Sequence, residues 1–167
     1  IGSDPEETEF SRQRTIVYDN RQNVYQTIEV VDPTQEPPVL NISYADFEDP
    51  NNPYLMTYSE APNGSKSWMT YTSEGLIKTM TDDHLNVTTY IYAEELPSFN
   101  PKHRNLLRFI LRPEVAVNGS SVQYPPTEFQ YDEEGNLKKI IDAAGKETVF
   151  DVNSAGQVES VTDRNGH

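Results

Sequence analysis

Apolar and polar residues alternate in short stretches along this 167-residue chain, and glycine-containing turns separate the stretches. Within residues 147–152, Thr148, Phe150 and Val152 occupy every second position, and residues 88–92 repeat that arrangement. A two-residue period is typical of a strand with one buried face, because successive side chains of a strand point to opposite sides. The pattern therefore predicts an all-β fold built from short strands.

The strands and turns recur at fixed spacings. When Gly135 is aligned with Gly156, four further positions from Leu137 to Gly145 match in the same register. A longer offset aligns the segment 71–90 with the segment 131–150. Looser copies begin at Tyr18 and at Asn105, where Asn105 and Leu106 match Asn136 and Leu137. The repeated positions, which we expect to be structural, are Tyr71, Gly75, Asp82, Tyr131, Gly135, Asp142, Gly145, Gly156, Asp163 and Gly166.

Each copy is expected to fold as strand, turn, strand, turn. The segments 142–145 (DAAG) and 163–166 (DRNG) begin with Asp and end with Gly, which is the preference of a type I turn whose Asp carboxylate accepts backbone hydrogen bonds. Leu137 and Ile140 lie three positions apart and so would face opposite sides of a regular strand. Either a bulge intervenes or both faces are partly covered.

The pattern Tyr131-Asp132-x-x-Gly135-Asn136-Leu137, followed by Ile140-x-Asp142-x-x-Gly145 and Thr148-x-Phe150, resembles the YD repeat of Rhs, wall-associated, insecticidal-toxin C-component and teneurin proteins. This resemblance implies consecutive antiparallel β-hairpins in an extended, curved sheet, which in complete members encloses a polypeptide as a shell. A segment of this length would form only an arc of such a shell. The family's self-cleavage motif, around Asp-Pro-x-Gly-Leu, has no counterpart here.

The repeat also suggests how the chain is organised. Residues 1–11 are expected to be a mobile acidic tail and residues 12–167 a single hairpin-repeat unit, with the clearest repeats at 71–92 and 131–167. Residues 32–70 lack the repeat register and contain Pro- and Asn-rich loops, as expected of an irregular insertion.

The stretch 101–112 has two interpretations. Its arginines recur at every fourth position, and Asn100 and Pro101 resemble a helix cap, which favours a short helix. A strand fits better, because residues 124–132 return directly to the repeat register.

Charge and composition exclude several classes of function. The formal net charge of −14 argues against a nucleic-acid partner, because phosphate binding needs clustered Lys and Arg. The absence of cysteine excludes disulfides and thiolate metal sites, and no apolar run is long enough for membrane insertion. Phosphate-binding glycine motifs and the G-x-S-x-G nucleophile motif are absent as well, so we expect no cofactor.

Carboxylates and imidazoles are the remaining candidates for chemistry. The pairs Glu94-Glu95 and Glu133-Glu134 consist of adjacent residues, which point apart on a strand and cannot converge on one bond. None of the three histidines has a second ligand at a metal-binding spacing. We therefore predict no catalytic residue and no metal site, and a protein that is not an enzyme.

Exposed aromatic and basic side chains are the best candidates for ligand binding. Tyrosine and tryptophan stack on sugar rings, which makes Trp68, Tyr54 and Tyr58 candidates, although aromatic residues in strands more often pack across the sheet. Arg104 and Arg108 could meet an anionic glycan or an acidic partner, or could simply balance the acidic chain.

The function predicted from these observations is structural. We expect a segment of a larger secreted or cell-surface YD-repeat protein, with the remainder of that polypeptide as its partner. Unpaired strand edges would favour dimerisation. A carbohydrate-binding or adhesive module that uses exposed aromatics is the alternative, with glycans or a surface partner as ligand.

Overall fold

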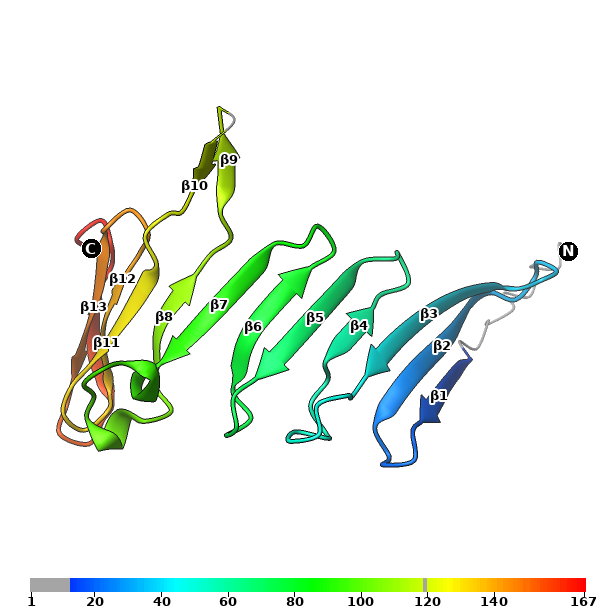
Figure 1. The fold of residues 1–167 in the computed structure, drawn as a ribbon, viewed down its shortest axis with the longest axis horizontal. Coiled ribbons are helices and arrows are strands. Elements are labelled where there is room, and N and C mark those ends of the chain that lie inside the picture. Colours follow the sequence, from blue (N-terminus) through cyan, green and yellow to red (C-terminus); the bar gives the residue numbers. More distant parts are fainter. Residues whose placement is uncertain (1–12, 119) are drawn as a thin grey trace, which may run out of the picture. The chain divides into compact units, whose positions relative to one another are not determined.

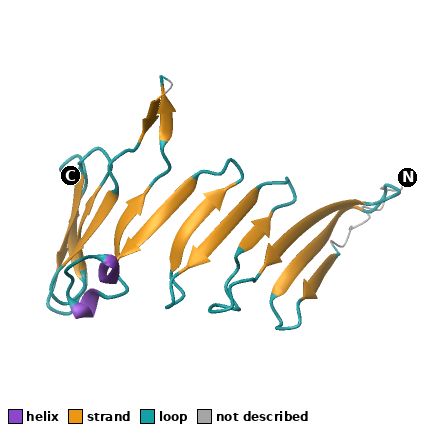
Figure 2. Cartoon of the chain, in the orientation of Figure 1, coloured by secondary structure: helices purple, strands orange, loops and turns teal. Residues whose placement is uncertain are grey.

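The structure is a computed structural model that describes residues 13–118 and 120–167. The expected tail, residues 1–11, lies outside the described residues. Strands dominate the described part of the chain, whose helices are two short 3-10 turns, η1 (Ala93–Glu95) and η2 (Pro101–His103) (Figure 2). The predicted all-β class is therefore confirmed. In these same residues we find no helix of the length and apolar character that crossing a membrane requires.

Strands that follow one another in the chain are neighbours in one antiparallel sheet. In hydrogen-bonded order the sheet contains β1 (Arg14–Tyr18), β2 (Val24–Asp32), β3 (Val39–Asp46), β4 (Tyr58–Glu60), β5 (Lys66–Tyr71), β6 (Ile77–Asp82), β7 (Val87–Tyr92), β8 (Leu107–Leu111), β11 (Thr127–Tyr131), β12 (Leu137–Ile141), β13 (Glu147–Val152) and β14 (Val158–Thr162). The sequence divides between Ser67 and Trp68 into two compact units. Consecutive hairpins, as predicted, are the organising element of each unit.

One hairpin interrupts the regular order in the second unit. Strands β9 (Val115–Val117) and β10 (Ser120–Val122) pair only with each other and project beyond the ends of β7 and β8 (Figure 1). Strand β8 therefore pairs with β11, whose Thr127 and Glu128 lie opposite Ile110 and Phe109.

Strand pairing reproduces both spacings of the sequence repeat. Ile140 of β12 pairs with Thr148 of β13, and in the earlier copy Met80 of β6 pairs with Thr88 of β7. Phe129 of β11 pairs with Ile140, and at the shorter spacing the same pairing recurs in the β13–β14 hairpin. The predicted repeat therefore corresponds to a repeated hydrogen-bond register.

A bulge lies between Leu137 and Ile140, which is one of the two alternatives left open by their spacing of three positions. Gln130 pairs with Lys139 while the next residue, Tyr131, pairs with Leu137, so Lys138 is an extra residue of β12. Because one extra residue shifts the alternation, side chains three positions apart need not face opposite sides. Tyr25 of β2 and Glu159 of β14 are the corresponding extra residues of their hairpins.

The stretch 101–112 contains a strand, as favoured, with a single 3-10 turn before it. Asn100 caps the turn by accepting the backbone N–H of Lys102 at 3.1 Å, and the strand β8 begins shortly after the turn, at Leu107. The predicted match of Leu106 with Leu137 is wrong by one position, because Leu107 pairs with Tyr92 as Leu137 pairs with Tyr131. The loop 93–106 replaces a tight turn here, so the local spacing differs from that of the other copies.

Few side chains of the described residues are buried. Met69, Tyr92 and Ala93 are the buried apolar residues among them, whereas many large apolar side chains of the strands remain exposed, such as Val158 at 55% and Val161 at 49%. A single sheet without a covering layer leaves both faces accessible, and stable sheets usually pack one face against another layer. The described chain therefore lacks the enclosed core of an independent domain.

Candidate functional site

The feature that recurs with the same hydrogen bonds in the described residues is a five-residue turn, which lies at the end of a strand. In each copy the first residue donates its backbone N–H to the carbonyl of the fifth, and the fourth donates back to the carbonyl of the first. Turns of this form begin at Asp19, Ala61, Thr72, Asp82, Asp132, Asp142, Asn153 and Asp163. The fourth residue has positive φ in every copy, which is the geometry of a type I turn followed by a left-handed residue.

The leading aspartate organises this turn. In the copy at Asp142, one carboxylate oxygen accepts the N–H groups of Ala144 and Lys146, both at 2.9 Å. The same two bonds form at Asp19, Asp82, Asp132 and Asp163. An amide oxygen does the same at Asn153. The predicted role of the Asp side chain is therefore confirmed, because it accepts backbone N–H groups of its own turn. The carboxylate of Asp142 also lies 3.7 Å from the guanidinium of Arg164 in another turn.

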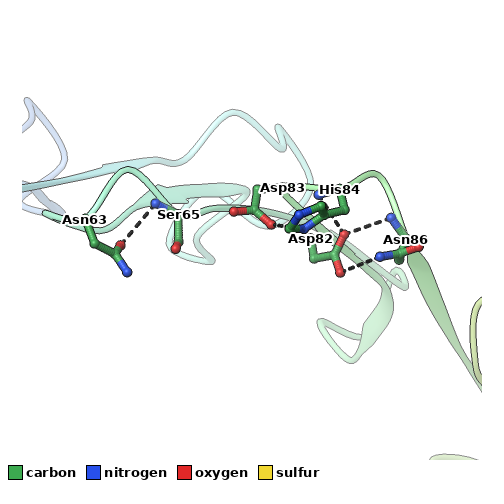
Figure 3. Close-up of polar contacts among 6 residues, drawn as sticks. All are labelled: Asn63, Ser65, Asp82, Asp83, His84 and Asn86. Carbon is green, nitrogen blue, oxygen red and sulfur yellow. Dashed lines mark hydrogen bonds and ion pairs between the residues drawn. The ribbon is translucent and has the colours of Figure 1, made fainter.

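Asparagine at the fifth position uses the second oxygen of the aspartate. Asn86 donates its side-chain N–H to Asp82 at 2.8 Å (Figure 3), and Asn136 donates to Asp132 at 2.9 Å. Asn23 and Asp19 are joined in the same way at 3.0 Å. In the sequence this asparagine served only to align the copies of the repeat. Its fixed spacing of four residues from the Asp is nevertheless a signal for the side-chain hydrogen bond.

These hydrogen bonds stabilise the ionised aspartates. The side-chain N–H of Asn86 holds the pKa of Asp82 below its ordinary value, and that of Asn136 does so for Asp132. For Asp142 and Asp163 the largest cause of the lowered pKa is the backbone N–H of the fifth turn residue. Carboxylates that are ionised and already bonded at neutral pH are poor proton donors, so these residues suit a structural role.

Two tyrosines tie neighbouring strands together. Tyr92, which is buried, donates its hydroxyl to the carbonyl of Ile77 at 2.9 Å, and Tyr131 donates to the carbonyl of Leu107 at 2.8 Å. Burial raises the pKa of both hydroxyls. Each tyrosine lies at the end of a strand and bonds to another strand of the sheet, so these side chains contribute to sheet cohesion.

The aromatic residues predicted to bind ligands occupy different surroundings. Tyr54 lies in the loop before β4 and is 68% exposed, whereas Trp68 lies on β5 and is 37% exposed. Tyr58 of β4 donates its hydroxyl to Glu60 at 2.6 Å, which raises the pKa of Tyr58 to about 12. Tyr54 and Tyr58 belong to the first compact unit and Trp68 to the second.

The two candidate arginines differ in their contacts within the protein and in their exposure. The guanidinium of Arg108 donates to the carbonyl of Phe129 at 2.9 Å and lies 3.6 Å from the carboxylate of Glu128. These contacts join β8 to β11. Arg104 follows η2 and is exposed. The hydroxyl of Ser73 is the main cause of the lowered pKa of Glu74, and the positive charge of Arg104 is a smaller one.

One turn brings together three side chains that could ligate a metal. The ligand atoms of Asp82, Asp83 and His84 lie within 4.8 Å of one another, at the turn that follows β6 (Figure 3). Asp83 and His84 form a contact of 2.7 Å. Both oxygens of Asp82 already accept hydrogen bonds within the turn, so an ion would have to compete with the bonds that shape it.

In the loop 93–106 polar side-chain atoms of His103 and Glu94 are buried, and the sequence did not indicate this burial. His103 is only 9% exposed, and its ring lies 6.1 Å from that of Tyr131 in a tilted arrangement. In the described part of the chain, Nε2 of His103 and Oε2 of Glu94 are buried without a hydrogen-bond partner. No spacing signal in the sequence distinguishes these residues from their exposed neighbours.

The first unit contains a shallow hollow of about 350 Å³ over strands β2, β3 and β4. Tyr25 and Tyr44 line it, together with polar residues that include Gln26, Ser43 and Glu60. Neither tyrosine was among the predicted ligand-binding aromatics.

No family model and no curated protein matches this chain significantly. Solved structures are similar to it over 90% of its length. They include TcdB2-TccC3-Cdc42 and TcdB2-TccC3 without its hypervariable C-terminal region, each with a TM-score of 0.49 and 12% identity. The Tc holotoxin pore of Photorhabdus luminescens gives a TM-score of 0.33 at 12% identity. This chain spans about a tenth of those chains, 9% of the first two and 10% of the third.

Proposed function

We propose that this chain is a non-enzymatic structural segment of a larger secreted or cell-surface protein of the YD-repeat type, in which hairpins add side by side to extend a sheet. The observation on which this rests is the repeated turn, which recurs with the same hydrogen bonds in hairpin after hairpin. A repeat whose units contact only their neighbours is suited to building length rather than a single pocket.

The small number of buried apolar side chains supports the proposal that this chain packs against a partner. Three buried apolar residues in the described part of the chain are too few for a free-standing domain of this length, which would bury most of its apolar side chains. The exposed apolar residues of the strands would be covered by further polypeptide. The remainder of the parent protein is the partner we propose, because further hairpins would extend the sheet at its edges and polypeptide packed on the face of the sheet would cover these side chains.

The test combines solution behaviour with the flanking genetic sequence. We expect the isolated chain to bind a fluorescent dye for apolar surface, and to self-associate in sedimentation velocity as its concentration rises. We also expect flanking coding sequence to contain further YDxxGN units. A monomer that stays compact at high concentration and binds no dye would contradict the proposal, as would flanking sequence without such units.

A glycan-binding function is the second candidate, and the hollow of the first unit favours it. Tyr25 is 38% exposed and Tyr44 is 40% exposed, and polar side chains lie beside them, as a sugar site requires. Binding on a glycan array that Tyr44→Ala abolishes would support this function at the hollow. If Trp68→Ala abolishes it instead, the aromatic residue first predicted from the sequence is the ligand contact.

A further inference from the structure

We propose that Asn63 is a site of spontaneous chemical modification, at which its side-chain amide is converted to a carboxylate through a cyclic imide formed with the backbone nitrogen of Gly64. The reaction is an intramolecular deamidation, and water is its co-reactant. This inference goes beyond the structural function, because it depends neither on the parent protein nor on a ligand.

The reaction joins the backbone nitrogen of Gly64 to Cγ of Asn63. As that bond forms, the bond from Cγ to Nδ2 breaks and ammonia leaves, while the N–H proton of Gly64 passes to solvent. Water then opens the imide at either of its carbonyl carbons, which gives aspartate or isoaspartate. Glycine favours ring closure because it has no Cβ, and no heavy atom lies within 4 Å of a Cβ built at Gly64. Isoaspartate would lengthen the main chain of the turn that connects β4 to β5.

The turn Ala61–Ser65 places the side chain of Asn63 in a conformation that favours this reaction. The turn begins with alanine instead of aspartate, and Oδ1 of Asn63 accepts the N–H of the fifth residue, Ser65, at 3.1 Å (Figure 3). This hydrogen bond spans Gly64, so it folds the side-chain carbonyl over the backbone nitrogen that attacks it. The N–H of Ser65 also stabilises the negative charge that develops on Oδ1 during ring closure. All five turn residues are exposed, so water reaches them.

The turn Asp163–His167 has the same Asn-Gly pair at its third and fourth positions and provides an internal comparison. One carboxylate oxygen of Asp163 accepts the N–H groups of Asn165 and His167 at 2.8 and 3.0 Å, and the other accepts the side-chain N–H of Asn165 at 3.4 Å. The N–H of the fifth residue is therefore bonded to Asp163, and the carboxylate beside the amide opposes negative charge on it. In both turns the glycine N–H donates to the carbonyl of the first residue at 2.9 Å, so this bond does not distinguish them.

The experiment compares the two sites in the full chain and exchanges the first residues of their turns. The chain is incubated in mildly alkaline buffer, and peptide mapping by mass spectrometry measures conversion at Asn63 and at Asn165. Ala61→Asp supplies the first turn with a leading carboxylate, and Asp163→Ala removes it from the second. Gly64→Ala is the negative control, because its Cβ hinders ring closure. The same incubation in urea measures both sites in the unfolded chain. A third Asn-Gly pair, at 118 and 119, is measured separately because residue 119 lies outside the described residues.

In the native chain we expect Asn63 to be converted about fivefold faster than Asn165, which is the factor that one hydrogen bond contributes to a rate. Ala61→Asp should slow conversion at Asn63, and Asp163→Ala should speed conversion at Asn165. In urea the two rates should converge, because the reacting pair is the same. Equal rates in the native chain would overturn the proposal, and so would a difference that persists unchanged in urea. The comparison within the parent chain needs no substitution, so it decides the question even if a variant fails to fold.

Discussion

Leu85 occupies a position where the other regular turns of the second unit have glycine. Its φ is +64°, and the corresponding residue of the later copy is Gly145 with φ +75°. The left-handed region costs an L-residue roughly 1–2 kcal/mol because Cβ approaches the backbone, and glycine avoids this cost. Leu85 is 74% exposed, so its side chain contributes little burial that could offset the strain.

The size of this strain can be measured by comparing Leu85→Gly with Leu85→Ala. Both variants remove the leucine side chain, but only glycine removes the Cβ. Relief of roughly 1–2 kcal/mol is partly offset by about 0.4–1 kcal/mol for the greater freedom of glycine in the unfolded chain. We therefore expect Leu85→Gly to be more stable than Leu85→Ala by about 0.5–1 kcal/mol. In a chain of this length that difference raises Tm by roughly 1–4 °C.

The assay is thermal or urea unfolding followed by circular dichroism, and Gly145 provides the matched control. No heavy atom lies within 4 Å of a Cβ added at Gly145, so Gly145→Ala should lose a similar free energy of unfolding for conformational reasons alone. The reasoning is refuted if Leu85→Ala is as stable as Leu85→Gly, or if Gly145→Ala has no effect. Either result would mean that the left-handed residue is not strained in these turns.

Three further predictions concern single contacts. The lowered pKa of Asp142 means that its contribution to stability is present above the unfolded pKa, about 3.9, and is lost as pH falls through the folded pKa. Asp142→Asn keeps the turn acceptor without titrating, so its Tm should fall less than that of the parent protein between about pH 5 and about pH 3. Tyr92→Phe should lose about 0.5–1.5 kcal/mol of unfolding free energy with its hydroxyl bond, while Tyr90→Phe, whose hydroxyl has no such bond among the described residues, should change it little. Gly156→Ala should lower Tm more than Gly145→Ala does, because its Cβ would lie 2.9 Å from the Oδ1 atom of Asn136. Equal Tm losses in the two glycine variants would contradict this contact.

The repeated register was predictable because its determinants are local in the sequence. The Asp that begins a turn and the Gly that ends it lie close together in the chain, and both carry a specific backbone requirement. When a turn of this kind lies at each end of a strand, the two turns together determine the length of the strand and therefore the spacing of the repeat. The predicted repeat, in which Ile140 and Thr148 match Met80 and Thr88, is therefore confirmed as a repeated pairing.

The features that sequence reasoning missed depend on contacts between distant residues. Arg108 is the extra residue of a bulge and also bonds to the carbonyl of Phe129 on another strand, which no periodicity reveals. The burial of His103 depends on the loop 93–106 packing near Tyr131. Leu85 departs from the glycine pattern, so its left-handed conformation became apparent only from the backbone.

Ligand recognition is more to be expected where the chain departs from the repeat than at the repeated turns. In the turns that pair Asp with Asn, such as Asp132 and Asn136, both carboxylate oxygens accept hydrogen bonds from the turn itself. A ligand would have to break these bonds, and leaving a turn amide unpaired costs more than one new contact returns. The irregular segment before β4 presents the ring of Tyr54, which is 68% exposed, and this residue lies outside the strands whose register the turns determine. Variation in that segment can therefore change what the protein contacts while the repeated turns keep the sheet in register.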